Sequence, residues 1–360
     1  MDLKLGEQLR ALPGPILITG HTGFKGTWLT FLLEHLGVPT VGYSLAPEKD
    51  SLYDRAALKG KIPELYADIR NADTFRHFLT VHKPSAVIHM AAQPLVLQSY
   101  KTPRETFDVN VMGTVNVLDE AFVTDYVQAI IVVTTDKVYR NDNSGRAFVE
   151  TDPLEGKDPY SASKVGAEAV VSAWQQIQNV SGGPKVVSVR AGNVIGGGDW
   201  AENRLIPDLV RGFTSGKPIK IRNPVNTRPW QHVLDPLIGY LMTLEYVLDG
   251  RKILSVNFAP TGHSLSVTEV ANIANECWGE GPKIEFSKVK LSDNYESVNL
   301  ALDASYASKL FNSTSHWSQE KSIEKSVIWW KKVLENSSNP QECIKSDIQE
   351  FLSKITEKLN

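Results

Sequence analysis

Tyr160 and Lys164 are four residues apart in the run Tyr-Ser-Ala-Ser-Lys, and their side chains could act together in proton transfer. On a helix this spacing places both side chains on the same face. An ammonium group beside a phenol can lower the phenol pKa, and such a phenol can exchange a proton with a hydroxyl group during hydride transfer. Because Tyr-x-x-x-Lys often arises by chance, this interpretation depends on the residues around it.

A second group of reactive residues follows the apolar run Ala129–Val133. The next residues are Thr134 and Thr135, and after them come an acid and a base, Asp136 and Lys137. At the end of a strand both would point into the same pocket, where such a pair can remove one proton and deliver another during an elimination. The alternative is a solvated Asp-Lys pair with no chemical role.

A glycine-rich turn lies between the apolar run that ends at Thr19 and a helix-like stretch. Its sequence is Gly20-His21-Thr22-Gly23-Phe24-Lys25-Gly26. Glycines at these positions permit a tight turn and close approach of the backbone to a pyrophosphate, while a following helix N-terminus offers free N–H groups to an anion. We therefore predict dinucleotide binding by Gly20, Thr22, Gly23, Phe24 and Lys25. The alternative is a purely structural turn.

The elements that must position these residues alternate along the first half of the chain. Short apolar runs predict strands at Ile16–Thr19, Pro39–Tyr43, Ser85–Met90, Ala129–Val133 and Lys185–Val189. Helical spacing predicts helices at Phe24–Leu36, Asn71–His82, Asn110–Phe122 and Ser161–Ile177. This alternation is typical of an α/β fold with a Rossmann-type doubly wound parallel sheet, which binds its ligand at the carboxyl ends of the strands.

The alternation ends near Arg190, where glycine and proline become frequent. We predict that residues 1–190 form the dinucleotide-binding domain and that residues 191–345 form a smaller mixed domain for the substrate. Residues around 232–260 include a predicted strand, Ser255–Phe258, and are expected to return to the sheet. The remaining residues, 346–360, are expected to form a C-terminal helix or tail.

The composition of the 360 residues excludes several classes of protein. With 38 Lys and Arg against 41 Asp and Glu the net charge is −3, whereas a protein that binds nucleic acid needs an excess of basic charge on one face. Two cysteines, Cys277 and Cys343, exclude a disulfide or zinc-finger scaffold, and no cluster has metal-ligand spacing. No apolar run approaches the about 18 residues that span a membrane. We expect a cytoplasmic protein that binds no metal, nucleic acid or membrane.

The glycine turn and the Tyr160–Lys164 pair together resemble the extended short-chain dehydrogenase/reductase superfamily, from about Ile16 to at least Pro260. The resemblance implies that Lys164 holds the nicotinamide ribose and that Ser44 contacts the adenosine ribose. It further implies cofactor contacts from Asp68, Ile69, Ala91, Ala92, Gln93, Asn110, Thr134 and Tyr160. Because a serine hydroxyl neither strongly attracts nor strongly repels a 2′-phosphate, the sequence leaves NADP open beside the expected NAD.

Longer segments resemble one branch of that superfamily, the CDP-glucose 4,6-dehydratases. These segments are Gly20–Leu29, Ala91–Val96, Asp158–Lys164, Arg190–Trp200 and Arg228–Val233. The resemblance implies a nucleotide-sugar dehydratase that oxidises C4, eliminates water across C5–C6 and returns the same hydride to C6. It assigns the O4 hydrogen bond to Thr135, O4 deprotonation to Tyr160 and protonation of the leaving O6 to Asp136. Lys137 is expected to act either as a base or as an electrostatic stabiliser.

The same resemblance supplies candidate contacts to the substrate, a CDP-hexose. Asn193 and Arg228 are expected to bind the diphosphate, since a guanidinium can pair with two oxygens at once. Gln93 and Thr135 are expected to contact the sugar. The residues expected to enclose the ribose and base are Asn203, Arg204, Leu205, Ile221 and Asn223.

Two other functions stay open on the sequence alone. A nucleotide-sugar 4-epimerase would use Tyr160 and the cofactor but not Asp136 and Lys137. A non-catalytic NAD(P)-sensing protein would keep only the fold, and it has no need for Thr135, Tyr160 and Lys164. Members of the superfamily commonly dimerise through a four-helix contact, and the apolar stripe on the Tyr160 helix is consistent with a core or with a homodimer.

Overall fold

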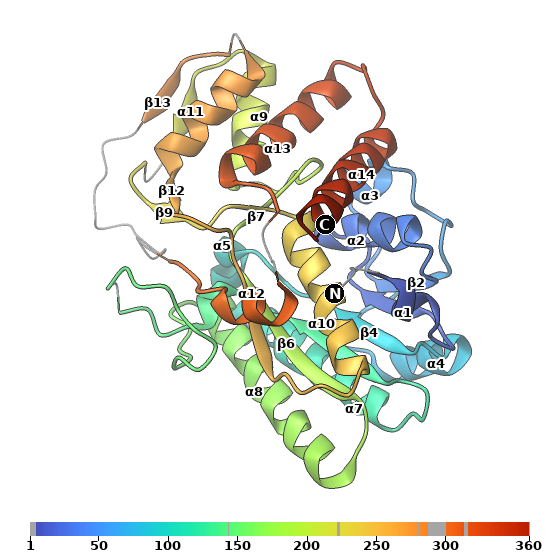
Figure 1. The fold of residues 1–360 in the computed structure, drawn as a ribbon. Helices are drawn as coiled ribbons and strands as arrows, with labels where there is room; N and C mark the ends of the chain where they lie inside the picture. The colour runs from blue at the N-terminus through green and yellow to red at the C-terminus, as the bar shows by residue number, and fades with distance from the viewer. Residues whose placement is uncertain are drawn as a thin grey trace.

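The computed structural model of the protein describes residues 5–142, 144–221, 224–279, 281–286, 300–312 and 316–359. At its centre lies a seven-stranded sheet in the order β11-β6-β5-β4-β1-β2-β3, in which every neighbouring pair is parallel (Figure 1). The strands are β1 (Ile16–Thr19), β2 (Thr40–Ser44), β3 (Glu64–Tyr66), β4 (Ala86–His89), β5 (Ala129–Val133), β6 (Lys185–Ala191) and β11 (Ser255–Phe258). The sheet confirms the predicted Rossmann-type α/β fold.

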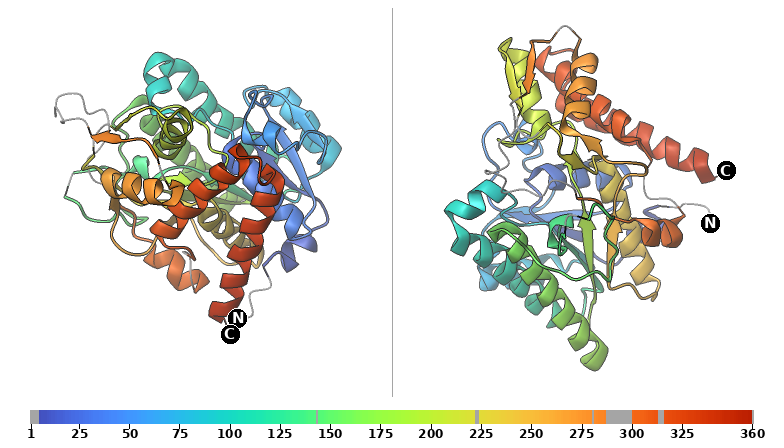
Figure 2. Two further views of the ribbon diagram at one scale, coloured as in Figure 1. Left: turned by 90° about the horizontal axis from the view of Figure 1, so that it is seen from above. Right: turned by 90° about the vertical axis from the view of Figure 1, so that its left-hand side faces the viewer.

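Helices cover both faces of this sheet (Figure 2). They are α2 (Phe24–His35) and α10 (Leu234–Leu248) on one face, and α4 (Ala72–His82), α7 (Gly113–Phe122) and α8 (Pro159–Ser181) on the other. Successive strand residues point to opposite faces, so Ile16 and Ile18 join the core formed with α2 and α10, whereas Leu17 joins the core formed with α4, α7 and α8. Because helices cover both faces, the central strands are almost wholly apolar.

The strands and helices predicted for the first half are confirmed to within a few residues, apart from the start of one helix. The sequence does not predict β3, because a three-residue edge strand carries no periodic pattern. The helix expected at Asn110–Phe122 begins earlier, as α6 (Pro103–Phe107), and continues through a π-helical turn, η1 (Asp108–Met112), into α7. A π turn departs from the 3.6-residue period on which the prediction depends.

Part of the second half of the chain forms a smaller lobe, with α9 and α11 at the top of Figure 1. Its elements are β7 (Val194–Ile195), α9 (Leu205–Ser215), β8 (Ile219–Ile221), β9 (Thr227–Arg228), β10 (Gln231–His232), β12 (Leu265–Ser266), α11 (Val267–Trp278), β13 (Ile284–Phe286) and α13 (Gln319–Leu334). Small two-stranded sheets join β7 to β10, β8 to β13 and β9 to β12. Between these elements the chain passes back through α10 and β11, so that β11 becomes the edge strand of the main sheet.

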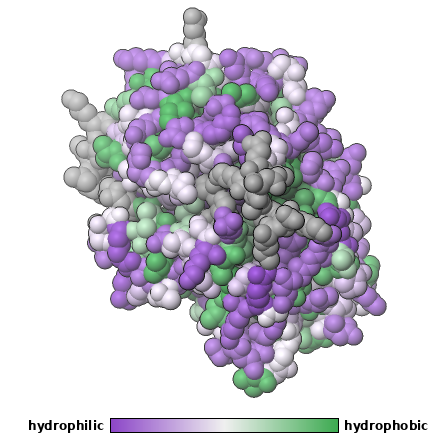
Figure 3. All heavy atoms as spheres, in the orientation of Figure 1, coloured by the Kyte–Doolittle hydropathy of each residue, from purple (hydrophilic) through white to green (hydrophobic). Residues whose placement is uncertain are grey.

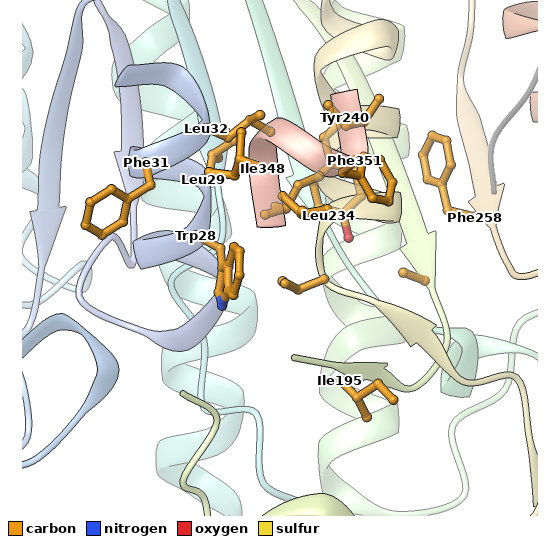
Figure 4. Close-up of a cluster of buried hydrophobic side chains, with 14 of the residues drawn as sticks. Trp28, Leu29, Phe31, Leu32, Ile195, Leu234, Tyr240, Phe258, Ile348 and Phe351 are labelled. Carbon is orange, nitrogen blue, oxygen red and sulfur yellow. The ribbon is translucent and has the colours of Figure 1, made fainter. Parts of the chain in front are cut away.

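The C-terminal helix α14 (Pro340–Leu359) packs against α2 and α13. Its Ile348 and Phe351 are fully buried, and Figure 4 shows them beside Leu32 of α2 and Tyr240 of α10. The apolar face of α14 is therefore part of the main core, which also contains Trp28.

The surface shown in Figure 3 is mainly hydrophilic, with apolar atoms in scattered groups. Among the described residues no helix is long and apolar enough to cross a membrane, and no three His, Cys, Asp or Glu side chains gather as a metal site would require. The other short helical elements are α1 (Glu7–Arg10), α3 (Leu52–Arg55), α5 (Val96–Lys101), η2 (Asp136–Val138) and α12 (Ser305–Phe311).

Candidate active site

Helix α8 carries Tyr160 and Lys164, and a capping box fixes where the helix begins. The Asp158 carboxylate accepts a 2.9 Å hydrogen bond from the Ser161 N–H, and the Ser161 hydroxyl accepts one of 3.0 Å from the Asp158 N–H. Pro159 occupies the first helical position, where a missing N–H costs nothing. Tyr160 therefore lies in the first turn, with Lys164 one turn further along the same face.

The segment after β5 brings Thr135 and Asp136 to this end of α8. The Thr135 side chain is hydrogen-bonded to the Tyr160 phenol, and its hydroxyl lies 2.9 Å from Oδ1 of Asp136, to which it donates. Asp136 is 1% exposed, and its second oxygen, Oδ2, is buried without a hydrogen-bond partner. Nζ of Lys137 is 3.9 Å from Oδ1 of Asp136. The residues predicted for proton transfer thus meet at the carboxyl end of β5.

The electrostatics of the Tyr160–Lys164 pair differ from the sequence-based expectation. Burial raises the pKa of Tyr160 to about 12, and the positive charge of Arg204 opposes this rise. The Lys164 ammonium donates a 3.1 Å hydrogen bond to the Val133 carbonyl oxygen. Burial lowers the pKa of Lys164 to about 8, against the opposing negative charge of Glu168. The four-residue spacing predicts that the two side chains share a helix face. The free-energy cost of burying their charged forms depends on the whole fold, so the spacing does not predict it.

The glycine turn is packed too closely for larger residues. Gly20 has a φ of 77°, and a Cβ there would lie 2.8 Å from the backbone nitrogen of Ala91, in the loop after β4. A Cβ at Gly26 would lie 2.3 Å from the Gly20 carbonyl oxygen. Gly23 is the N-cap of α2, so the first N–H groups of that helix face the turn. This arrangement fits the anion-binding turn of a dinucleotide site.

The residues predicted to contact the adenosine come from the turn, from the end of β2 and from the segment after β3. The hydroxyls of Thr22 and Ser44 are 2.8 Å apart at the end of β2. The Asp68 carboxylate is held by the guanidinium of Arg70, with Nη2 2.6 Å from Oδ2, and this contact lowers the pKa of Asp68. Ile69 is buried. The hydroxyl pair is placed to meet a ribose, whereas the Asp68 carboxylate already has a charged partner.

The π-helical turn η1 places Asn110 in a buried hydrogen-bond network. Oδ1 of Asn110 accepts a 2.8 Å hydrogen bond from the Gln93 N–H, and Nδ2 donates to the Gln93 carbonyl oxygen at 3.1 Å and to the Ser163 hydroxyl at 2.8 Å. The Gln93 side-chain amide is hydrogen-bonded within the same region. Asn110 therefore ties the loop that carries Ala91 and Ala92 to helix α8.

Lys25, in the glycine turn, lies within electrostatic reach of Lys164 and Asp136. Its Nζ donates a 3.1 Å hydrogen bond to the hydroxyl of Tyr240 on α10. Burial lowers the pKa of Lys25 to about 7, as do the positive charges of Arg204 and Lys164, while Asp136 acts in the opposite direction. The sequence marks Lys25 as a cofactor residue but gives no signal for Tyr240, because the contact joins residues 215 positions apart.

Two arginines predicted to bind substrate lie in different surroundings. Arg204 directly precedes α9, and its guanidinium lies 3.2 Å from the Asp199 carboxylate. Its positive charge acts on Tyr160, so it lies within electrostatic reach of that phenol. Arg228 is 5% exposed in β9, where it donates a 2.8 Å hydrogen bond to the Thr227 carbonyl oxygen.

The other predicted substrate residues lie on the segments around these arginines. The carbonyl oxygen of Asn193 accepts a 3.0 Å hydrogen bond from the backbone of β10. Asn203 has a positive φ of 62° and lies just before α9, which begins at Leu205. Ile221 is buried at the end of β8, and Asn223 lies outside the described residues.

The model of the NAD dependent epimerase/dehydratase family matches residues 16–257. The chain belongs to this family. It is similar to the CDP-glucose 4,6-dehydratase of Salmonella typhimurium, with 36% identity over 352 residues that cover 95% of this chain and 97% of the relative. It is also similar to the dTDP-glucose 4,6-dehydratase of Xanthomonas campestris pv. campestris, with 29% identity over 234 residues, 61% of this chain and 64% of the relative.

Solved structures of other nucleotide-sugar enzymes have the same fold as this epimerase/dehydratase family member. The dTDP-glucose 4,6-dehydratase from Bacillus anthracis, in complex with NAD, superposes with a TM-score of 0.75 at 21% identity, covering 89% of this chain and 98% of that structure. The UDP-glucose-4-epimerase from Stenotrophomonas maltophila, with bound NAD, has a TM-score of 0.78 at 18% identity, covering 90% and 100%. The shared fold therefore extends over most of the chain.

Glu168 is a residue of this family member's site that the sequence analysis missed. It lies one turn beyond Lys164 on α8, and its carboxylate forms a bidentate ion pair with Arg190 of β6. An acid four residues after Lys164 indicates a shared helix face, but the spacing does not reveal that the acid is buried.

Proposed function

We propose that this protein is an NAD-dependent nucleotide-sugar 4,6-dehydratase, a hydro-lyase that converts CDP-glucose to CDP-4-keto-6-deoxy-glucose. The observation that carries the proposal is the buried Oδ2 of Asp136, which has no hydrogen-bond partner and lies beside Thr135 and Lys137. A 4-epimerase needs proton exchange only at O4, whereas a dehydratase also needs an acid for the leaving hydroxyl. The 36% identity to a CDP-glucose 4,6-dehydratase supports the same reaction and nucleotide.

The residues around the glycine turn fit NAD. We assign the pyrophosphate to the backbone of Gly20, Gly23, Phe24 and Lys25, where the helix N-terminus favours an anion. The other cofactor contacts are assigned to Thr22, Ser44, Asp68, Ile69, Ala91, Ala92, Gln93, Asn110, Thr134, Tyr160 and Lys164. When bound, NAD accepts the hydride from C4 and returns it to C6. We propose NAD rather than NADP because neutral hydroxyls suit a free ribose, whereas a 2′-phosphate is usually met by an arginine.

Tyr160 is assigned to take the proton from the O4-hydroxyl as C4 is oxidised. Because burial raises its pKa to about 12, its phenolate needs stabilisation, and the positive charge of Arg204 acts in that direction. Lys164, on the same helix face, is assigned to the nicotinamide ribose. The resulting ketone at C4 makes the C5–H acidic, which prepares the elimination.

Asp136 and Lys137 are assigned to the loss of water across C5–C6. Oδ1 of Asp136 is engaged by the Thr135 hydroxyl, so we assign the proton delivered to O6 to Oδ2. Lys137 is assigned to C5, either as a neutral base that takes the C5 proton and later returns it, or as an ammonium that stabilises the enolate while solvent takes that proton. A proton returned to C5 then completes the 6-deoxy sugar.

The nucleotide is assigned to the second half of the chain. We propose that residues 1–190 bind the cofactor and that residues 191–345 bind the CDP-hexose. Asn193 and Arg228 are assigned to the diphosphate, and Gln93 and Thr135 to the sugar. The ribose and base are assigned to Asn203, Arg204, Leu205, Ile221 and Asn223. A net charge of −3 does not oppose an anionic substrate, because a few well-placed donors suffice.

We further propose that the protein is a cytoplasmic homodimer. Apolar side chains are exposed on α5, α6 and η1, which pack beside α8: Leu97 (43%), Tyr100 (42%), Phe107 (41%) and Met112 (50%). A second copy of this face would cover them, and sedimentation of the Met112→Glu variant as a monomer would support that contact.

Both cysteines are free, as expected in a reducing compartment.

The test is incubation with NAD and CDP-glucose followed by alkali. A 4-keto sugar develops an ultraviolet absorbance in alkali, and we expect this product from CDP-glucose, with slower turnover of dTDP-glucose and UDP-glucose. A C4-inverted sugar without keto product would identify a 4-epimerase. Unchanged sugar with bound NAD would identify a sensing protein. Either of these results would overturn the proposal.

A further inference from the structure

The buried carboxylate of Glu168 accepts hydrogen bonds from three residues, one of which directly precedes the proposed catalytic residue Thr135. It is 5% exposed, and its Oε1 accepts hydrogen bonds from the Thr134 hydroxyl at 2.5 Å and from Nε of Arg190 at 2.8 Å. Its Oε2 accepts from Nη2 of Arg190 at 2.7 Å and from the Ser188 hydroxyl at 2.8 Å. Glu168 therefore ties α8 both to the end of β5 and to β6.

Arg190 continues the network on its other side. Its Nη1 donates to the hydroxyl of Tyr139 at 2.7 Å and to the carbonyl oxygen of Glu150 at 3.1 Å. The Tyr139 hydroxyl in turn donates to Oδ1 of Asn257 on β11 at 2.7 Å. Tyr139 is 2% exposed, so these contacts are shielded from water.

The ion pair therefore holds both ends of one short segment. Thr134, its first residue, is bound by Glu168, and Tyr139, its last residue, is bound by Arg190. Between them lie Thr135, Asp136 and Lys137, followed by Val138. A planar, bidentate guanidinium–carboxylate pair adds geometric specificity as well as energy, so it can hold the segment in one orientation.

We propose that Glu168 and Arg190 are positioning residues that hold both ends of the segment Thr134–Tyr139 and so align Thr135 and Asp136 with Tyr160 on α8. This inference rests on the proposed dehydratase reaction, in which the segment supplies groups to the oxidation and to the elimination. Proton transfers in both steps require near-ideal geometry, because a misplacement of about 1 Å can cost 10²-fold in rate.

Glu168 also acts on Lys164 by charge. Burial lowers the pKa of Lys164, and Glu168 opposes this fall from one helical turn away. The other titratable groups that face Lys164 are Lys25 from α2 and His89 from β4, whose pKa values Lys164 helps to lower. Without the Glu168 charge, the Lys164 ammonium would deprotonate at lower pH.

The test compares three variants in the full-length protein. Glu168→Gln alone leaves Arg190 as an unpaired buried cation and can fail to fold, so Glu168→Gln is combined with Arg190→Met, which leaves no unpaired buried charge. Tyr139→Phe releases only the far end of the segment. Gln175→Met is the matched control: Gln175 is a buried residue of α8 that ties it to the carbonyl oxygens of Val186 and Leu254 without touching the segment.

We expect the double variant to fold, to keep the KM for CDP-glucose and to lose about 10²-fold in kcat, with the alkaline limb of its pH profile moved to lower pH. Tyr139→Phe is expected to build up reduced nicotinamide during turnover, because Asp136 and Lys137 lie closer to the released end of the segment than Thr135 does. Gln175→Met is expected to lower the melting temperature while keeping the wild-type kcat and pH profile.

The wild-type protein is the first arm of this test. Without keto product from CDP-glucose, both the proposed function and this inference are overturned. With keto product, a double variant that keeps the wild-type kcat and pH profile overturns the inference alone, because the ion pair then only stabilises the fold. A double variant that loses kcat and is as stable as the control supports positioning.

Discussion

The hydroxyl of Thr135 donates a 2.9 Å hydrogen bond to Oδ1 of Asp136. This contact joins the residue assigned to C4 oxidation to the residue assigned to the elimination. It also leaves Oδ2 of Asp136 as a buried oxygen without a hydrogen-bond partner. Substitutions on the two sides of this contact are therefore expected to separate the two halves of the reaction.

Asp136→Asn is expected to block elimination and spare oxidation. The amide keeps the shape of the side chain but cannot deliver a proton to O6, so formation of the keto-deoxy sugar should fall by about 10²- to 10⁴-fold. Reduced nicotinamide should accumulate, and its absorbance in stopped-flow mixing measures it. The matched control is Asp249→Asn, a surface residue paired with Arg251, which should turn over like the wild type. Wild-type product formation by Asp136→Asn would remove Asp136 from the mechanism.

Lys137→Met is expected to stop dehydration while NAD still binds. The side chain is 25% exposed and 3.9 Å from Oδ1 of Asp136, so its loss should leave the fold and the glycine turn intact. Calorimetric titration with NAD and the keto-sugar assay measure the two effects. Lys101→Met, on an exposed position of α5, is the control and should behave as wild type. Turnover at the wild-type rate in Lys137→Met contradicts its assignment.

Lys25→Met is expected to stabilise the protein without bound cofactor in a pH-dependent way. The pKa of Lys25 is about 7 in the folded protein, against 10.5 in an unfolded chain. Below about pH 7 Lys25 is charged in both the folded and the unfolded protein, so the folded state bears the full free-energy cost of burying the charge. This cost decreases as the pH rises from 7 toward 10.5, because Lys25 is then increasingly neutral in the folded state. The gain in melting temperature should therefore be largest at low pH and shrink above pH 7. A gain that grows with pH would contradict the environment described for Lys25.

Asn110→Ala is expected to loosen the contact between the loop after β4 and α8. It leaves the Gln93 backbone groups and the Ser163 hydroxyl without their partner, which should cost about 1–3 kcal/mol of unfolding free energy. Denaturant unfolding measures that loss, and titration with NAD should show weaker binding because the loop carries Ala91. Asn179→Ala, exposed on α8, is the control. Unchanged stability and NAD affinity in Asn110→Ala would rule out this role.

The sequence predicts the features that depend on local geometry. The glycine turn is recognisable because a strand, a turn and a helix follow one another directly, and the Tyr160–Lys164 pair is recognisable because four-residue spacing defines one helix face. The order of the elements then places both groups at the same edge of a parallel sheet. That edge is where the structure brings Thr135, Asp136 and Tyr160 together.

The features that the sequence does not predict depend on tertiary contacts. Tyr240 meets Lys25 across 215 positions, and Arg190 meets Tyr139 across 51. The sequence also does not predict the direction of the Tyr160 pKa shift. Burial raises this pKa, and burial depends on the whole fold. Residue spacing identifies candidate partners, whereas packing decides which of them share a low-dielectric site.

The most direct test of the dehydratase assignment follows one hydrogen atom. CDP-glucose carrying deuterium at C4 is incubated with the protein and NAD, and the product is analysed by mass spectrometry and NMR. We predict a CDP-4-keto-6-deoxy sugar with deuterium at C6, because the hydride removed from C4 is the one returned after water has left. A C4-inverted sugar that keeps its 6-hydroxyl, or a keto sugar without deuterium at C6, would contradict this mechanism.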